Sequence, residues 1–463
     1  AQWSFRELDG LANAAAHLLI EQGIGPRSRV AMMAGNRPEF AAIVFGALKA
    51  GAAVVMISPA WKETEVAHAL GLTEPALVVC DGATPDVLGG LVPDDRIVHL
   101  DDDAVHADLL GRSGQRPAVD LEWTAAEAVL VFSSGTTGMP KAVRHTHGSL
   151  EVAIGHWVSA LGLGPDDRMQ VATPPFHILG LLNLLAAAAA GAGVRLHPRF
   201  DLDALLHHIE TDGVTIEMAV APIALAMADH PDLERYDLSS LRYIMWGATP
   251  VTESVAERVT ERTGVRFLPA YGASELPVIT ANPVRRPDAW RLDSAGLPIH
   301  DLRLRIVDLE TGEELAARET GEIQVLSPSA MSGYLPEEAN AEAFVDGWYR
   351  TGDVGWVEAD GWLHITDRVK EMIKVKGFQV APAEIEAVLH GHPDVVDCAV
   401  FGVPDASTAG EAVVAVVTLR KGSATRPDEL GMLVADRLAS YKRPSAVHLV
   451  DEIPRLPSGK VLR

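Results

Sequence analysis

The sequence predicts an α/β protein with a large N-terminal domain of layered β-sheets and helices, a small β-subdomain, and a small α+β C-terminal domain. Three observations lead to this prediction. Residues 4–110 alternate helical and strand-like apolar patterns, residues 300–366 carry β-hairpin patterns, and a fresh α+β pattern follows Arg368. A chain of 463 residues is also too long for one ordinary core, so at least two domains are expected.

The alternation begins with helical spacing of apolar residues over 8–23, which stops at Gly23. RVAMMAG (29–35) and AAVVMIS (52–58) have the pattern of short buried strands, and the helical segment FAAIVFGALKAG (40–51) separates them. ALVVCDG (76–82) repeats the strand pattern, and residues 214–250 continue the alternation. Strands that alternate with helices indicate largely parallel sheets.

The most apolar stretch is ILGLLNLLAAAAAGAGV, residues 178–194, which Asn183 interrupts. A transmembrane helix needs about 20 strongly apolar residues. This stretch is shorter and rich in Ala, so we expect a buried helix and no integral membrane segment.

Residues 300–366 have a different pattern, with short strand-like runs separated by turn residues. RLRIVDLETGEEL (303–315) and GEIQVLS (321–327) have β-hairpin character, and WYRTGD (348–353) and EADGWLHI (358–365) suggest two further short hairpins. Helices are expected near 382–390 and 427–439, with a terminal strand at 446–451. The proposed domains are residues 1–369 and 370–463.

Composition narrows the class of protein. The apolar fraction of 48% and charged fraction of 22% suit a soluble globular chain. The formal net charge of −24 argues against a general nucleic-acid or anionic-membrane binder, but allows an anionic small molecule in a locally basic cleft. Cys80 and Cys398 lie too far apart in sequence to suggest a disulfide framework or a Cys-rich zinc site, so a reducing cytoplasm is expected. No signal peptide is visible, the chain opens in mid-pattern without Met, and no pattern sets an oligomeric state.

One loop has the chemistry of a phosphate site. SSGTTGMPK (133–141) combines hydroxyl side chains, glycines that let backbone N–H groups approach a phosphate, and Lys141 as a point charge. It is not a Walker loop, because Gly138 and Lys141 are separated by two residues and Ala142 follows the lysine. The residue chemistry favours phosphate binding over a plain turn.

SSGTTGMPK resembles the signature loop of the adenylate-forming superfamily, which includes acyl-CoA synthetases, luciferases and peptide-synthetase adenylation domains. Further stretches resemble the superfamily's conserved cores in the same order along essentially the whole chain: PPFH (174–177), YGASE (271–275), YRTGD (349–353), DRVKEMIKVKGFQVAPAEIE (367–386) and PSGK (457–460). The sequence is most similar to 4-coumarate–CoA ligases and related acyl-CoA ligases.

The resemblance implies a two-step reaction that uses ATP, Mg²⁺ and coenzyme A. A substrate carboxylate attacks the α-phosphate of ATP, and pyrophosphate, whose phosphates the loop binds, leaves. The CoA thiol then attacks the acyl-adenylate. Three alternatives stay open: transfer to the pantetheine of a carrier protein, a binding protein that has lost catalysis, and a luciferase-like oxygenase.

The resemblance also implies residue roles in the large domain. Tyr271 would stack on adenine, Ser274 would contact the α-phosphate, and Asp353 would accept hydrogen bonds from the ribose hydroxyls. Glu275 would help to hold Mg²⁺, because a hard cation suits a carboxylate. Gly272 would leave room for the acyl group. The remaining residues expected to bind cofactor in this domain are Ser133, Ser134, Gly135, Thr136, Thr137, Gly138, Lys141, Gly247, Ala248 and Arg368.

The C-terminal domain is implied to be mobile, with its hinge at Lys370. Lys460 would stabilise the charge that develops at the carboxylate and α-phosphate during adenylation. Rotation would withdraw it and bring four residues of the second half-reaction to the site: Lys374 and Gln379 as catalytic groups, Gly377 as a gap for pantetheine, and Phe378. In the large domain, His177 would act as an aromatic gate between the ATP and acyl sides.

Two positions depart from the 4-coumarate–CoA ligase pattern, which commonly has Ser at the position of Trp246 and Gln-Gly at Pro269-Ala270. Trp246 could shorten the acyl pocket, re-aim it, or lie outside it in the core. The residues around it are small and apolar, so a hydrophobic carboxylic acid is expected, whether aryl, fatty or polycyclic. The paired histidines at 145/147 and 207/208 lack metal-ligand spacing and are interpreted as non-metal residues.

Overall fold

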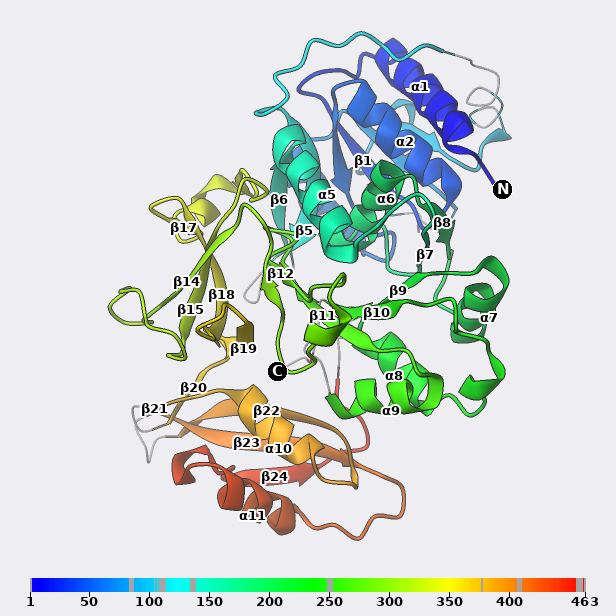
Figure 1. Cartoon of the computed structure of the whole chain (residues 1–463). Coiled ribbons are helices and arrows are strands. Elements are labelled where there is room, and N and C mark those ends of the chain that lie inside the picture. The colour runs from blue at the N-terminus through cyan, green and yellow to red at the C-terminus, as the bar shows by residue number, and fades with distance from the viewer. Residues whose placement is uncertain are drawn as a thin grey trace.

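The computed structural model describes residues 2–82, 87–103, 105, 107, 114–133, 139–247, 253–375, 378–405, 410–454 and 461, with the backbone alone at residues 221, 378, 379, 405 and 410. Figure 1 shows the large domain above and the small C-terminal domain below. Short 3₁₀ turns lie at Asp94–Arg96, Leu233–Arg235, Pro287–Ala289, Glu337–Asn340 and Ser440–Lys442.

The first part of the chain builds a sheet with the strand order β16-β6-β5-β2-β1-β3-β4. Its inner strands pair in parallel, and β6 pairs antiparallel with β5 and β16. The prediction of an α/β protein with largely parallel sheets is therefore confirmed. The strands are β1 (Arg29–Met33), β2 (Ala53–Met56), β3 (Leu77–Cys80), β4 (Ile97–His99), β5 (Glu127–Ser133), β6 (Lys141–Thr146) and β16 (Gly333–Leu335).

Helices cover both faces of this sheet because its strands are apolar on both sides. Helices α1 (Phe5–Glu21) and α2 (Pro38–Lys49) pack on one face, and α3 (Glu63–Thr73) packs on the other. A capping box between Ser4 and Glu7 starts α1. Gly51, with φ of 79°, follows α2 and supplies the left-handed backbone that ends it.

The second sheet has the order β13-β12-β11-β10-β9-β7-β8. Strands β7 (Arg168–Val171), β8 (Gly193–Leu196), β9 (Ile216–Ala219), β10 (Tyr243–Trp246) and β11 (Phe267–Tyr271) are parallel, and β12 (Thr280–Ala281) and β13 (Leu297–Pro298) continue the sheet antiparallel. Helices α7 (Leu202–Asp212), α8 (Ala221–Asp229) and α9 (Glu253–Thr263) cover its outer face.

Helices α5 (His147–Leu161) and α6 (Ile178–Ala190) lie between the two sheets. Leu181 and Leu185 of α6 pack toward the first sheet, whereas Leu182 and Ala186 pack toward the second. A helix buried on both sides must be apolar all round, which explains the apolar stretch and confirms the expected buried helix. No helix within the described part of the chain is long and apolar enough to span a lipid bilayer.

The β-subdomain consists of β14 (Arg303–Val307), β15 (Gly321–Leu326), β17 (Phe344–Val345), β18 (Trp348–Val357) and β19 (Leu363–Arg368), all paired antiparallel. EADGWLHI forms the predicted turn between β18 and β19. The hairpin predicted at WYRTGD is wrong, because these residues lie inside the single strand β18. Gly352, with φ of 69°, lies where the pairing of β15 with β18 is irregular, so it bends the strand instead of reversing it.

The C-terminal domain starts with the hairpin of β20 (Ile373–Val375) and β21 (Phe378–Val380). Its main sheet joins β22 (Val395–Asp405), β23 (Gly410–Leu419) and β24 (Ala446–Leu449). Helices α10 (Pro382–His390) and α11 (Pro427–Arg437) pack on this sheet around a separate hydrophobic core, close to the two expected helices. The chain between β19 and β20, residues 369–372, is the link to the large domain.

Candidate active site

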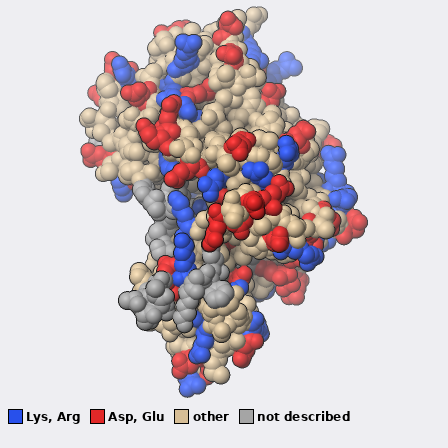
Figure 2. Space-filling model, turned by 90° about the vertical axis from the view of Figure 1, so that its left-hand side faces the viewer, with Lys and Arg blue, Asp and Glu red and all other residues tan. Residues whose placement is uncertain are grey.

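A cleft of about 3600 Å³ lies between the large and small domains. Figure 2 shows the molecule from the side, with the small domain below a narrowing and with acidic and basic side chains interspersed over the described surface of the large domain. The cleft is lined from distant segments: the ends of β5 and β6, residues 172–179, residues 269–277, β18, β19 and the interdomain link. Most of the described residues to which the resemblance assigns a role line this cleft.

The phosphate-loop motif connects two antiparallel strands. Ser133 ends β5, Lys141 begins β6, and the two residues pair directly across the hairpin. A Walker loop instead joins a strand to a helix, so the fold separates this loop from that class. Ser134, Gly135, Thr136, Thr137 and Gly138 lie outside the described residues.

Asp353 is the centre of a small polar group. The Tyr271 hydroxyl donates to Asp353 Oδ2 at 2.5 Å, and Arg368 Nε lies 3.1 Å from Asp353 Oδ1. Asp353 and Arg368 face each other on β18 and β19, so sheet register alone brings the charges together. Burial, followed by the adjacent carboxylate, raises the pKa of Tyr271 well above its usual value of 10, so it stays a neutral donor.

Glu275 lines the cleft, and 9% of the residue's surface is exposed. Its Oε1 accepts a hydrogen bond of 2.8 Å from the Tyr334 hydroxyl, and the Lys141 Nζ is 5.0 Å from the centroid of the Tyr334 ring. Burial and the Glu275 charge both raise the pKa of Tyr334, which therefore remains a donor. Tyr334 brings the lysine of the loop and the carboxylate of YGASE to one place. None of the sequence motifs includes Tyr334. The sequence around it shows only a Gly-Tyr pair in a short strand pattern.

The turn that carries Glu275 depends on Gly272. A Cβ atom at this position would lie 2.1 Å from the carbonyl oxygen of Pro277, which no side chain tolerates. We expected this glycine to leave room for an acyl group; the structure adds a requirement of the turn's own backbone. The Ser274 carbonyl accepts a hydrogen bond of 2.8 Å from His145 Nε2. Burial lowers the pKa of His145 to about 4, so this imidazole is neutral.

His177 and Trp246 have different environments. His177 precedes α6 as its N-cap, lines the cleft and lies 5.1 Å from the Phe176 ring. Trp246 is only 1% exposed and packs edge-to-face on Phe267 in the core under the second sheet. Trp246 is therefore a core residue, and because it is also among the residues that line the cleft, it does not lie wholly outside the cleft. Gly247 also lines the cleft, and Ala248 lies outside the described residues.

Among the residues expected for the second half-reaction, Lys374 is the one whose side chain the structure describes, and it is not among the residues that line the cleft. Lys374 and Gln379 pair with each other across the β20–β21 hairpin, and Lys374 is exposed. Lys370, in the interdomain link, lines the cleft. Gly377 and Lys460 lie outside the described residues, as do the side chains of Phe378 and Gln379. Val461, which follows Lys460, lines the cleft.

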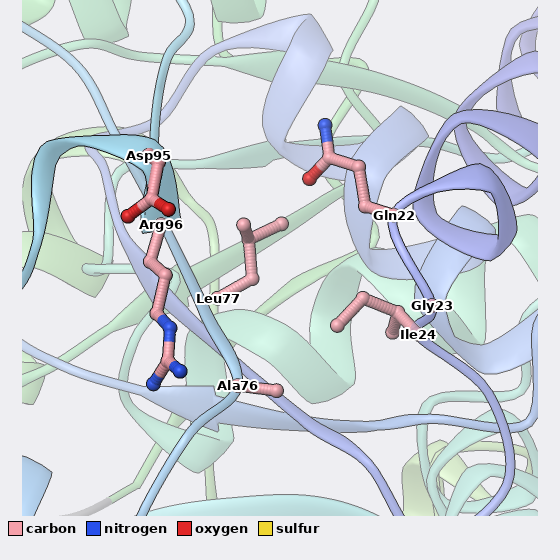
Figure 3. Close-up of a pocket in the computed structure, with 7 residues that line it drawn as sticks. All are labelled: Gln22, Gly23, Ile24, Ala76, Leu77, Asp95 and Arg96. Atoms are coloured by element: carbon pink, nitrogen blue, oxygen red, sulfur yellow. The ribbon is translucent and has the colours of Figure 1, made fainter.

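A second hollow, of about 480 Å³, lies at the end of α1 and the start of β3. Figure 3 shows Asp95 and Arg96 on one side of it and Gln22 on the other. No described residue that is expected to bind or react lines this hollow, so it is separate from the described part of the candidate site.

Comparisons with known proteins agree with this geometry. The chain matches the family model of the AMP-binding enzyme over residues 1–335 and that of the AMP-binding enzyme C-terminal domain over residues 384–460. It is 34% identical to 4-coumarate–CoA ligase 2 of Oryza sativa subsp. japonica, over 100% of this chain and 86% of the relative.

Two solved structures have the same fold. ATP-bound MatB from Rhodopseudomonas palustris matches with a TM-score of 0.91 and 27% identity, over 98% of this chain and 91% of that one. The amide bond synthetase McbA from Marinactinospora thermotolerans matches with a TM-score of 0.89 and 32% identity, over 98% and 92%. The chain therefore belongs to the AMP-binding enzyme family, the adenylate-forming superfamily, in the AMP-forming acyl-CoA synthetase group that contains the 4-coumarate–CoA ligases.

Proposed function

We propose that this protein is an ATP- and Mg²⁺-dependent acid–CoA ligase that activates a hydrophobic carboxylic acid through an acyl-adenylate. The observation that carries the proposal is the convergence of Lys141, the turn 271–275, and the Asp353–Arg368 pair on one interdomain cleft. These groups come from three distant segments and offer a cation for phosphate, a ring for adenine, and a carboxylate for ribose.

In the first half-reaction, an oxygen of the substrate carboxylate attacks the α-phosphorus of ATP. The bond between the α-phosphorus and the bridging oxygen breaks, and pyrophosphate leaves with the electron pair. Lys141, at the exit of the loop, would attract the leaving pyrophosphate. Tyr271 and Asp353 hold the nucleoside, and the Tyr271–Asp353 hydrogen bond fixes their relative position before ATP arrives.

Glu275 suits a bound Mg²⁺. Its carboxylate is nearly buried, faces the cleft and is oriented through Oε1 by Tyr334. Hard cations prefer oxygen ligands of this kind. When bound, the ion would neutralise phosphate charge. Glu275 would supply the carboxylate ligand for the ion, and Tyr334 would orient that carboxylate.

In the second half-reaction, a thiolate attacks the acyl carbonyl and AMP leaves. We propose that the small domain rotates about Lys370 between the two steps. Lys374 and Gln379 lie together on the hairpin that follows Lys370, so a rotation there moves them as a unit. Lys460 would serve the first half-reaction, and Val461, its neighbour in sequence, lines the cleft. Gly377 and Phe378 would accompany the hairpin and flank the pantetheine arm.

The acid is proposed to be hydrophobic because part of the cleft wall is apolar. Trp157, Ile178, Leu179 and Leu182, from α5 and α6, line it. Such a wall binds aryl or aliphatic carbon through burial of apolar surface. Cys80 is buried in the core of the large domain and Cys398 in the core of the small domain, an arrangement that supports a reducing compartment such as the cytoplasm.

The test is mass spectrometry of the products from purified protein, ATP, Mg²⁺ and a panel of hydrophobic acids, with and without CoA. We expect acyl-CoA and AMP when CoA is present, and acyl-AMP when it is absent. Acyl-AMP that forms but never moves to CoA would contradict the ligase and point to a carrier-protein pantetheine as acceptor. Absence of any adenylate, with ATP binding intact, would favour a protein that has lost catalysis.

A second acceptor class is favoured by one wall of the cleft. Glu253, Glu257 and Glu261 recur every fourth residue on α9, all are exposed, and all line the cleft. Their negative charges attract a protonated amine and oppose the phosphates of CoA. The amide bond synthetase McbA is among the similar structures. Including primary amines in the same panel tests this candidate, because an amide product would replace the thioester.

A further inference from the structure

The turn formed by residues 272–275 is held by segments far from it in sequence. The Met331 backbone N–H donates to the Glu275 carbonyl at 2.8 Å, and the His145 side chain donates to the Ser274 carbonyl at 2.8 Å. The Met331 contact comes from the backbone N–H, which any residue except proline could supply. The His145 contact is made by a side chain, so it is specific to the residue at that position.

His145 lies on the second strand of the first sheet, next to the edge strand β16. It belongs to β6, which pairs with β5 on one side and β16 on the other, and its side chain is completely buried. Side chains at every second position of a strand point to the same face. Lys141 and His145 therefore point to the same face of β6, and the intervening Val143 packs in the core shared with Leu276.

The strand between them is rigid because both of its edges are paired. Four residues of strand span about 13 Å. The distance from the lysine that exits the phosphate loop to the imidazole that holds Ser274 is therefore set by β6 itself. One strand places the two parts of the site that contact phosphates in the proposed function.

The hydrogen bond has a defined donor. A carbonyl oxygen only accepts, so His145 Nε2 carries the proton, and Nδ1 has no hydrogen-bond partner among the described residues. Without this donor, the carbonyl of the half-buried Ser274 would lose its side-chain partner, and the turn would lose a hydrogen bond next to Glu275. Removing the donor of a partly buried carbonyl is unfavourable enough to shift such a turn.

We propose that His145 is a positioning residue for ATP: it fixes the Ser274–Glu275 turn relative to Lys141 and so shapes the phosphate part of the site. This role rests on the proposed function, because it assumes that ATP binds at this turn. His145 itself makes no contact with substrate in the proposal.

The test is the dissociation constant of Mg²⁺-ATP measured by isothermal titration calorimetry on the whole chain. His145→Leu keeps a buried side chain of similar size without the donor and should weaken ATP binding on the order of tenfold. His145→Gln places an amide N–H near the position of Nε2 and should restore most of the affinity.

His147→Leu is the matched control. His147 is also buried, lies two residues away at the start of α5, and its Nε2 has no partner among the described residues. This variant should bind ATP like the wild type. Thermal unfolding of each variant without nucleotide separates loss of fold from loss of position.

Three outcomes overturn the inference. Equal ATP affinity of the wild type and His145→Leu would remove the positioning role while leaving the proposed function intact. Equal weakening by His145→Leu, His145→Gln and His147→Leu would indicate a general packing effect. A folded wild type that binds no ATP would overturn the proposed function and this role together.

Discussion

Glu217→Gln should change how the stability of this protein depends on pH. Glu217 lies on β9, has no exposed surface, and accepts a hydrogen bond of 2.7 Å from Gln170 through Oε2. His197 Nε2 in turn donates to Gln170 Oε1 at 2.7 Å. Glu217 Oε1 has no hydrogen-bond partner among the described residues. Burial therefore raises the pKa of Glu217 from 4.5 to about 8, and the carboxyl carries a proton at neutral pH.

The magnitude follows from the difference between the folded and unfolded states. Below pH 4.5 the carboxyl is protonated in both states, and its contribution to stability is fully present. As the pH rises toward 8 the unfolded chain ionises while the folded chain does not, and stability falls by roughly 1.4 kcal/mol per pH unit. The total loss across this window is therefore at most about 5 kcal/mol. Glutamine cannot ionise, so the variant should lack this slope, at the cost of an unpaired NH₂ group worth roughly 1–3 kcal/mol.

The assay is urea unfolding followed by tryptophan fluorescence between pH 5 and pH 9. The variant should be less stable than the wild type at pH 5 and more stable at pH 9, so the two curves cross. Glu210→Gln, at an exposed position of α7, is the control and should run parallel to the wild type. Parallel curves for Glu217→Gln would refute the reasoning, because they would show that Glu217 has the same charge in both states.

Three further variants test the site. Gly272→Ala should lower adenylate formation on the order of 100-fold, because the added Cβ must displace the turn from Pro277; pyrophosphate release measures it, and near-normal release would contradict the close approach. Tyr334→Phe should lower the rate of adenylate formation on the order of tenfold and raise the half-saturating Mg²⁺ concentration, because Glu275 loses a hydrogen-bond donor. An unchanged Mg²⁺ titration would show that Tyr334 does not orient the carboxylate. Lys460→Ala should abolish adenylation yet spare thioester formation from supplied acyl-adenylate, and equal loss of both steps would refute a role confined to the first.

Much of the fold could be predicted because it depends on local pattern. The spacing of apolar residues marks the strands and helices of the α/β layers, and the breadth of the apolar stretch at 178–190 marks α6 as buried on both sides. The hairpin predicted at WYRTGD was wrong because the glycine of a Thr-Gly pair readily takes a left-handed conformation. That conformation occurs in a turn and in a bulge alike. Only the pairing of β18 with β15 decided between them.

The sequence by itself determined the candidate chemistry: ordered motifs named the loop, Tyr271, Glu275, Asp353 and the small domain, because these residue types carry the required charges and donors. Only the tertiary structure decided which side chains contact one another. That Trp246 packs in the core, that Tyr334 orients Glu275, and that His145 holds Ser274 across 129 residues follow from how sheets stack and register. The physical reason is that spacing along a strand or helix sets which way a side chain points, while its partner depends on elements that meet only when the chain folds.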